Sequence, residues 1–136
     1  MRKAFIERPR METVSFRVNL AAGEEVTLTE RIKSDGTIES MRARFYAGQE
    51  NCLQIRPCVL QKGRKSLIDL LTYPEGTVNY ISGEDDTFEY PVVLSVQNDD
   101  EIKLYCKNVG DYEYTIVIDI VIDYFAGENR VIGGVL

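Results

Sequence analysis

Residues 112–124 read YEYTIVIDIVIDY, and they give the clearest indication of the fold class. Tyrosine or isoleucine occupies every second position from Tyr112 to Tyr124, and a period of two places these side chains on one face of a strand. The opposite face mixes polar residues with Val117, Val121 and Phe125. At about 3.3 Å per residue the element would span roughly 40 Å, so we expect it to bend or to contribute to two sheets.

The same alternation recurs in short runs along the rest of the chain. The runs are residues 14–20, 26–28, 41–45, 53–59, 88–96 and 102–106. The turn residues 97–100, QNDD, predict that the last two runs form a hairpin. Pro57 cannot donate to a strand ladder, which predicts an edge or a bulge there. Residues 66–73, SLIDLLTY, fit a short buried strand or one helical turn.

Seven to nine short strands without a long helix predict an all-β fold. The spacing favours an antiparallel two-sheet sandwich of the jelly-roll type, with an open barrel as the alternative. A length of 136 residues is that of one domain, so we expect residues 1–136 to form a single β-sandwich domain. Residues 1–10 and 126–136 have no evident strand partner and are predicted to be terminal arms.

The residues that enzymes use most often are missing. The chain has no histidine, which removes the commonest general base and metal ligand, and it has no glycine-rich phosphate loop. Carboxylates alone can hydrolyse glycosides, and Asp69, Glu89, Asp119 and Asp123 are the candidates, although the sequence leaves open whether two of them converge. We therefore expect no catalytic residues and no cofactor.

The charge distribution limits the partners. The net charge is −6, and the excess of acidic residues lies in residues 45–136, so a nucleic-acid partner is not expected. No apolar run approaches the roughly 20 residues that span a bilayer, which excludes a membrane partner. The start of the chain, MRKAFIERPR, lacks the apolar segment of a signal peptide. A cytoplasmic protein, or a virion component if the chain is encoded by a phage, is expected.

The chain has three cysteines, Cys52, Cys58 and Cys106. Cys52 and Cys58 lie six positions apart in one extended segment, too far apart for a disulfide, and their spacing is not that of a zinc site. Reduced thiols are the expected state, and the pairing of Cys106 with one of the other two remains open.

Two local clusters could bind ligands. The consecutive acids Glu84, Asp85 and Asp86 are weak candidates for calcium, since that ion prefers hard oxygen ligands, but a solvated loop tip explains them better. Elsewhere, exposed tyrosines can stack on sugars, as aromatic side chains do on lectin-like sandwiches. The candidates for glycan contact are Tyr46, Tyr73 and Tyr80.

A contiguous apolar stripe on a sheet tends to be covered by a partner, and the outward face of residues 112–124 suggests one. The alternative is a central strand that is buried on both sides. The C-terminal residues VIGGVL could add to the sheet edge of a neighbouring copy. The predicted interface residues are Val117, Val121, Phe125, Val131, Ile132, Val135 and Leu136.

Residues 88–108, FEYPVVLSVQNDDEIKLYCKN, and 111–125, DYEYTIVIDIVIDYF, are sandwich strands in a small, acidic, histidine-free chain with short arms. In these properties taken together, the chain resembles virion proteins of tailed bacteriophages, such as capsid decoration, head-fibre or tail proteins. The resemblance implies a non-enzymatic structural protein that associates with itself or with other virion proteins. The alternative is a carbohydrate-binding module that uses exposed tyrosines to bind a surface glycan.

Overall fold

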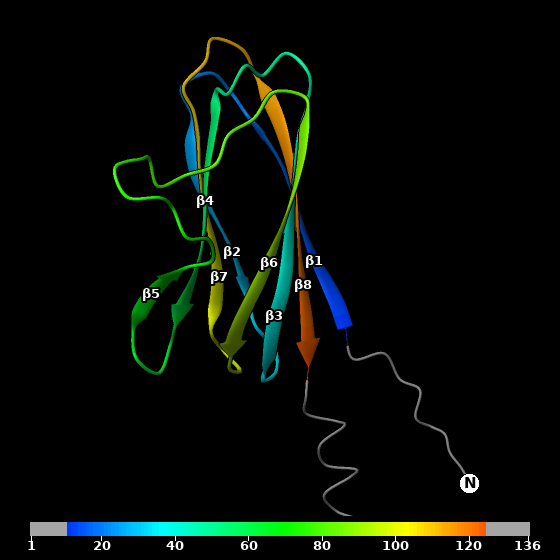
Figure 1. Ribbon diagram of the computed structural model, residues 1–136, viewed down its shortest axis with the longest axis vertical. Coiled ribbons are helices and arrows are strands. Elements are labelled where there is room, and N and C mark those ends of the chain that lie inside the picture. The colour runs from blue at the N-terminus through cyan, green and yellow to red at the C-terminus, as the bar shows by residue number, and fades with distance from the viewer. Residues whose placement is uncertain (1–10, 125–136) are drawn as a thin grey trace, which may run out of the picture.

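The computed structural model describes residues 11–124 (Figure 1). This part of the chain is an all-β two-sheet sandwich, and none of its segments is a helix long and apolar enough to cross a membrane. The strands are β1 (Met11–Leu20), β2 (Glu25–Arg31), β3 (Gly36–Phe45), β4 (Leu53–Gln61), β5 (Ser66–Asp69), β6 (Asp86–Val96), β7 (Glu101–Asn108) and β8 (Tyr114–Tyr124).

The strand order is that of a jelly roll. One sheet has the order β1-β8-β3-β6 and the other has the order β2-β7-β4-β5. The pairs β1–β8, β2–β7, β3–β6 and β4–β5 are therefore nested, like one long hairpin rolled into two sheets. The two four-stranded sheets share no strand, so the sandwich prediction is confirmed and the open barrel is wrong.

The predicted hairpin of residues 88–106 is wrong, because β6 and β7 belong to different sheets. The turn between them carries the chain across the sandwich and is fixed by hydrogen bonds to the β2–β3 connection. Ile32 N–H donates to the carbonyl of Asp100 at 2.7 Å, and Asp99 N–H donates to the carbonyl of Ile32 at 2.8 Å. Turn residues mark a reversal of the chain, but they do not say which sheet receives the next strand.

β8 is an inner strand of its sheet and pairs with both β1 and β3 along most of its length. The expectation that it contributes to two sheets is therefore wrong, and the strand begins at Tyr114 rather than Tyr112. Its four isoleucines face the other sheet and are buried. The alternating face predicted from the sequence is thus the middle of the hydrophobic core.

A β-bulge sets the phase of β3. The register shifts between Ile38 and Ser40, so Ile38 faces the core before the bulge and Met41, Ala43 and Phe45 face it afterwards. All four of these apolar side chains are fully buried. The inward face predicted for residues 41–45 is confirmed.

Pro57 lies in an inner strand but next to a gap in the sheet. β5 pairs with β4 only as far as the pair Cys58 and Asp69, so Pro57 lies just beyond the end of that ladder. Its carbonyl accepts a hydrogen bond from Leu70 N–H at 3.0 Å. The edge or bulge predicted at Pro57 is therefore wrong, because β4 is an inner strand whose register with β7 is continuous. Residues 66–69 form a strand rather than a helical turn.

Candidate functional site

The two lateral sides of the sandwich differ. β5 and β6 lie at one side, which we call the closed side, because the loop of residues 70–85 runs between them (Figure 1). β1 and β2 lie at the other side, which we call the open side, and the short connection of residues 21–24 joins them at one end. These two sides are the ends of both strand orders, so each has two edge strands.

The loop on the closed side is attached to the sheet by backbone hydrogen bonds. Ile81 and Ile55 exchange two of them, at 2.9 and 2.8 Å, and Asn51 N–H donates to the carbonyl of Gly83 at 3.0 Å. A Cβ atom added at Gly83 would lie 2.9 Å from the ring of Phe45, so the loop backbone lies directly on the core. The loop therefore covers the part of this side next to Phe45, while Phe88, Tyr90 and Leu94 of β6 remain half-buried and Leu94 lines a hollow of about 300 Å³.

An ion pair fixes the beginning of the same loop. Arg56 Nε and Nη2 donate to the two oxygens of Asp69 at 2.8 and 3.1 Å, and the Cys58 thiol donates to Asp69 at 3.3 Å. The hydrogen bonds from Arg56 hold the pKa of Asp69 below its usual value, whereas burial raises the pKa of the Cys58 thiol to about 12. Burial also raises the pKa of Tyr73 to about 12. This cluster is structural, with an ionised carboxylate and protonated neighbours.

The open side leaves apolar side chains partly exposed. In β1, Val14, Phe16 and Val18 face inward opposite buried isoleucines of β8, yet each remains half-buried. In β2, Val26 and Leu28 face inward opposite buried residues of β7 and are also half-buried. No described loop runs over them as it does on the closed side, so the core reaches the surface here.

The backbone of β1 is also available. β1 pairs with β8 alone among the described strands, so every second residue directs its N–H and carbonyl away from the sheet. At the end of the strand the Leu20 carbonyl accepts from Asn108 Nδ2 at 3.0 Å, which leaves residues 11–19 as the open part. The edge strand of the same sheet on the closed side, β6, contains Pro91, which has no N–H to offer.

The predicted interface on β8 lies in a polar surface. Val117 and Val121 point outward and are half-buried, but Asp119 separates them. Val117 lies between Arg17 and Arg44 of the neighbouring strands, and Val121 lies between a threonine and a serine. The structure therefore places no contiguous apolar stripe here. The other predicted interface residues lie outside the described residues: Phe125, Val131, Ile132, Val135 and Leu136.

The three tyrosines proposed for glycan contact do not share one surface. Tyr73 is half-buried beside the Arg56–Asp69 ion pair, and Tyr80 is half-buried later in the same loop. Tyr46 lies at the end of β3, is 37% exposed, and has the Arg44 guanidinium 5.0 Å from its ring centre. It contributes to a shallow hollow of about 310 Å³. This hollow is lined by Arg17, Tyr46, Ala47, Gln49, Glu113, Tyr114 and Thr115.

The acids of the proposed calcium site bind other groups. Glu84 accepts two hydrogen bonds from backbone N–H groups of residues 48–50, which lowers its pKa. Asp85 pairs with Arg44 at 2.8 Å, and Asp86 accepts from the backbone N–H of Glu84 at 2.8 Å. Within residues 11–124 no three acids, cysteines or histidines are grouped as metal ligands. The cluster thus stabilises the loop.

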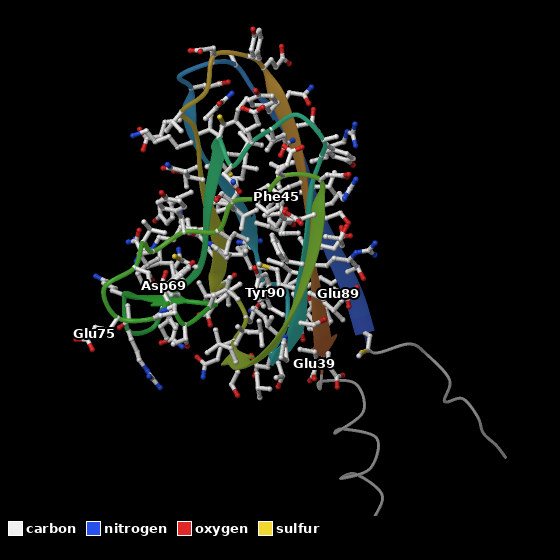
Figure 2. All side chains as sticks on the ribbon, turned by 45° about the horizontal axis from the view of Figure 1, so that its top comes forward. Glu39, Phe45, Asp69, Glu75, Glu89 and Tyr90 are labelled. Carbon is white, nitrogen blue, oxygen red and sulfur yellow. The ribbon has the colours of Figure 1, made fainter. Side chains whose placement is uncertain are left out.

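The candidate catalytic carboxylates are spread over the molecule. Asp69 and Glu89 lie on opposite outer surfaces, as Figure 2 shows. Asp119 and Asp123 lie four residues apart on one strand, roughly 13 Å, beyond the separation of about 5–9.5 Å in glycosidases. Arg42 stands between Asp119 and Glu89 in the cross-strand row and pairs with Glu89 at 3.9 Å.

All three cysteines are free. Cys106 faces the core, where burial raises its pKa to about 12, whereas Cys58 points to the outer surface of the same sheet. Cys52 is half-buried beside Gly110. The pairing of Cys106 that the sequence left open is therefore not formed, and Cys106 and Cys58 face opposite sides of their sheet.

No protein-family model matches the chain, and no curated protein matches it in sequence. Among solved structures it is similar to the Yersinia pseudotuberculosis-derived mitogen, with 10% identity and a TM-score of 0.51 over 80% of this chain and 84% of that chain. It is also similar to the infectious bursal disease virus VP2 subviral particle, with 12% identity and a TM-score of 0.49 over 90% of this chain and 34% of that chain.

A third similar structure is a serine protease of Aeromonas sobria, with 12% identity and a TM-score of 0.43 over 84% of this chain and 27% of that chain. The chain thus spans about a third or less of the viral and protease chains. At such low identity, the likeness to the mitogen shows the fold alone. The strand order of residues 11–124 is itself that of an all-β sandwich of the jelly-roll type.

Proposed function

We propose that this protein is a non-enzymatic structural domain that assembles with copies of itself or docks on a larger particle, such as a virion. The observation that carries the proposal is the open side, where five inward-facing apolar side chains of β1 and β2 stay half-buried next to an unpaired strand edge. Natural sandwiches protect such edges, because an exposed edge is a template for pairing with another chain.

The energetic reason is the hydrophobic effect. Burying apolar surface contributes about 25 cal/mol for each Å², so covering half-exposed valine and phenylalanine side chains favours association. The closed side gains part of this stabilisation within the chain, because its loop lies on Phe45 and is hydrogen-bonded to β4. On the open side, none of the described loops covers the half-buried apolar side chains. A partner bound there would bury them.

The proposal assigns no catalytic step to the chain. It has no histidine, and the candidate carboxylates with described partners serve ion pairs or cross-strand hydrogen bonds: Asp69 binds Arg56, Glu89 binds Arg42, and Asp119 accepts from Ser15. Jelly rolls serve as viral capsid and lectin domains. The fold is therefore compatible with a structural role in a virion, but the fold alone does not distinguish this role from sugar binding.

The test is the solution mass of the purified chain by light scattering, measured beside a variant truncated after Phe125. We expect an oligomer for the full chain. An oligomer that dissociates on truncation would assign a role to residues 126–136, whereas one that persists would place the contact within the sandwich. A monomer in both samples at all concentrations would contradict self-assembly.

A second candidate function is glycan binding at the hollow beside Tyr46, which combines an exposed aromatic ring with Arg17 and Glu113. Its volume is at the lower end of the range of roughly 300–1,000 Å³ for small-molecule sites. Titration of galactose, glucose and N-acetylglucosamine by NMR tests it. We expect shifts that Tyr46→Ala abolishes and that Tyr112→Ala, an exposed tyrosine outside the hollow, leaves unchanged; no shifts would exclude these sugars.

A further inference from the structure

We infer that β1 pairs with β1 of a second copy, antiparallel and about a twofold axis at Phe16, so that the two β1-β8-β3-β6 sheets become one eight-stranded sheet. The inference rests on the proposed assembly function and names its surface and its partner. A twofold contact requires a surface that is complementary to itself. The side chains along β1 meet that requirement in one register.

The inward face sets the register. In antiparallel pairs, directly opposite residues lie on the same face of the sheet. With Phe16 opposite Phe16 of the second copy, Val14 lies opposite Val18 and Val18 opposite Val14. All three half-buried apolar side chains of β1 then meet apolar partners. Such aromatic and β-branched cross-strand pairs stabilise sheets, and this one joins the two cores along the open side.

The outward face is compatible with the same register. Ser15 lies opposite Arg17 of the second copy, and Thr13 lies opposite Asn19. β1 contains one acid, Glu12, and one base, Arg17, so no like charges are placed opposite each other. The ladder ends near Leu20, whose carbonyl already accepts a hydrogen bond from an asparagine side chain.

The other edge strands are poorer candidates for self-pairing. β2 has seven residues, and the register that aligns Val26 with Leu28 of a second copy places Glu24 opposite Glu30, a repulsive pair. β6 contains Pro91, and β5 has only four residues and is continued by the loop of the closed side. β1 is the longest edge strand without a proline.

The register can be tested with engineered cysteines in the full chain. Positions 15 and 17 are on the outward face, so Ser15→Cys and Arg17→Cys spare the core. Each variant is oxidised alone and as a mixture of the two, and linked peptides are identified by mass spectrometry. Val93→Cys, on β6 and 86% exposed, is the matched control.

We expect a covalent dimer that links position 15 to position 17 and is at least ten times more abundant in the mixture than in either variant alone. A dimer from Ser15→Cys alone or from Arg17→Cys alone would overturn the register by moving the axis one residue along β1. Efficient linkage through Val93→Cys would overturn the choice of side. Light scattering on the same samples separates the two proposals: an oligomer without linkage at β1 overturns this inference only, and a monomer overturns both.

Discussion

The open and closed sides of the sandwich both end in edge strands, and they differ in how much of each side is covered by the chain itself. Each side has two edge strands and inward-facing apolar side chains near the surface. On the closed side a loop of sixteen residues, 70–85, is hydrogen-bonded to β4 at Ile55 and to the β3–β4 connection at Asn51. On the open side only the four residues 21–24 connect the two edge strands β1 and β2.

This difference is the structural basis of the proposed interface. A loop that covers an edge is a means of preventing edge-to-edge association, and so is a proline within an edge strand. Both are present on the closed side. The β1 edge lacks both protections: it is an unbroken strand with a row of half-buried apolar side chains. An interface formed by strand pairing requires such an edge.

The largest effect is expected from the contrast between two phenylalanines. Phe45 is fully buried under the loop and packs edge-to-face on Phe88, with ring centres 5.9 Å apart. Phe45→Ala should lower the free energy of unfolding by about 3–5 kcal/mol. Phe16→Ala on the open side should cost about 1–2 kcal/mol in a dilute, monomeric sample, because the side chain is only half-buried there.

Urea unfolding followed by circular dichroism measures both losses. Equal losses for the two variants in dilute solution would mean that Phe16 is as well covered as Phe45, and the distinction between the sides would fail. At high protein concentration the loss for Phe16→Ala should grow, because the wild-type chain then gains the stability of association.

An intermediate effect is expected from glycines near the closed side. A Cβ atom at Gly83 would lie 2.9 Å from the Phe45 ring, so Gly83→Ala should lift the loop and cost about 1–3 kcal/mol. Gly63, in the β4–β5 turn, has no atom within 4 Å of such a Cβ and is the matched control. Thermal unfolding compares them, and a Gly83→Ala variant as stable as Gly63→Ala would show that the loop does not lie tightly on the core.

The smallest effect is expected from surface charges. The Arg56–Asp69 pair is bidentate, and about a third of each side chain is exposed, so Asp69→Asn should cost roughly 1 kcal/mol after solvent screening. Glu89→Gln breaks a longer, more exposed contact with Arg42 and should cost about 0–0.5 kcal/mol. Equal losses would remove the special role of the Asp69 pair in fixing the loop.

The pH dependence of this difference has a definite sign. The pKa of Asp69 is lower in the folded protein than its ordinary value of 3.8, chiefly because Arg56 donates hydrogen bonds to the carboxylate. Its contribution is fully present above the unfolded pKa and is lost as the pH falls through the folded pKa. The stability gap between wild type and Asp69→Asn should therefore narrow on acidification, and a gap that widens would contradict the assignment.

The fold could be predicted from the sequence to the level of strands and their inward faces. The period of two in residues 112–124 and 88–96 identifies buried faces, because alternation follows directly from strand geometry. The hairpin at residues 97–100 was wrong because its turn residues are the same whether the next strand joins the same sheet or the opposite one. Sheet membership depends on contacts that are distant in sequence.

The candidate site was predicted less well. The sequence predicts an interface at Val117 and Val121 from an apolar stripe on the outward face, but their neighbours across the sheet are arginines, a threonine and a serine. The alternation of Val14, Phe16 and Val18 was visible, yet it looks the same in a central strand and in an edge strand. Only the sheet order shows that β1 is an edge, and that position makes it a candidate interface.

The most direct test of the open side is hydrogen–deuterium exchange of the wild-type chain at increasing protein concentration. The amides of β1 that point away from β8 pair with no strand within residues 11–124 of the same chain and should exchange quickly when the protein is dilute. We predict that peptides covering residues 11–20 become protected as the concentration rises, while those covering residues 86–96 of β6 do not change. Protection that rises in β6 and not in β1, or in neither strand while the mass increases, would contradict assembly through the open side.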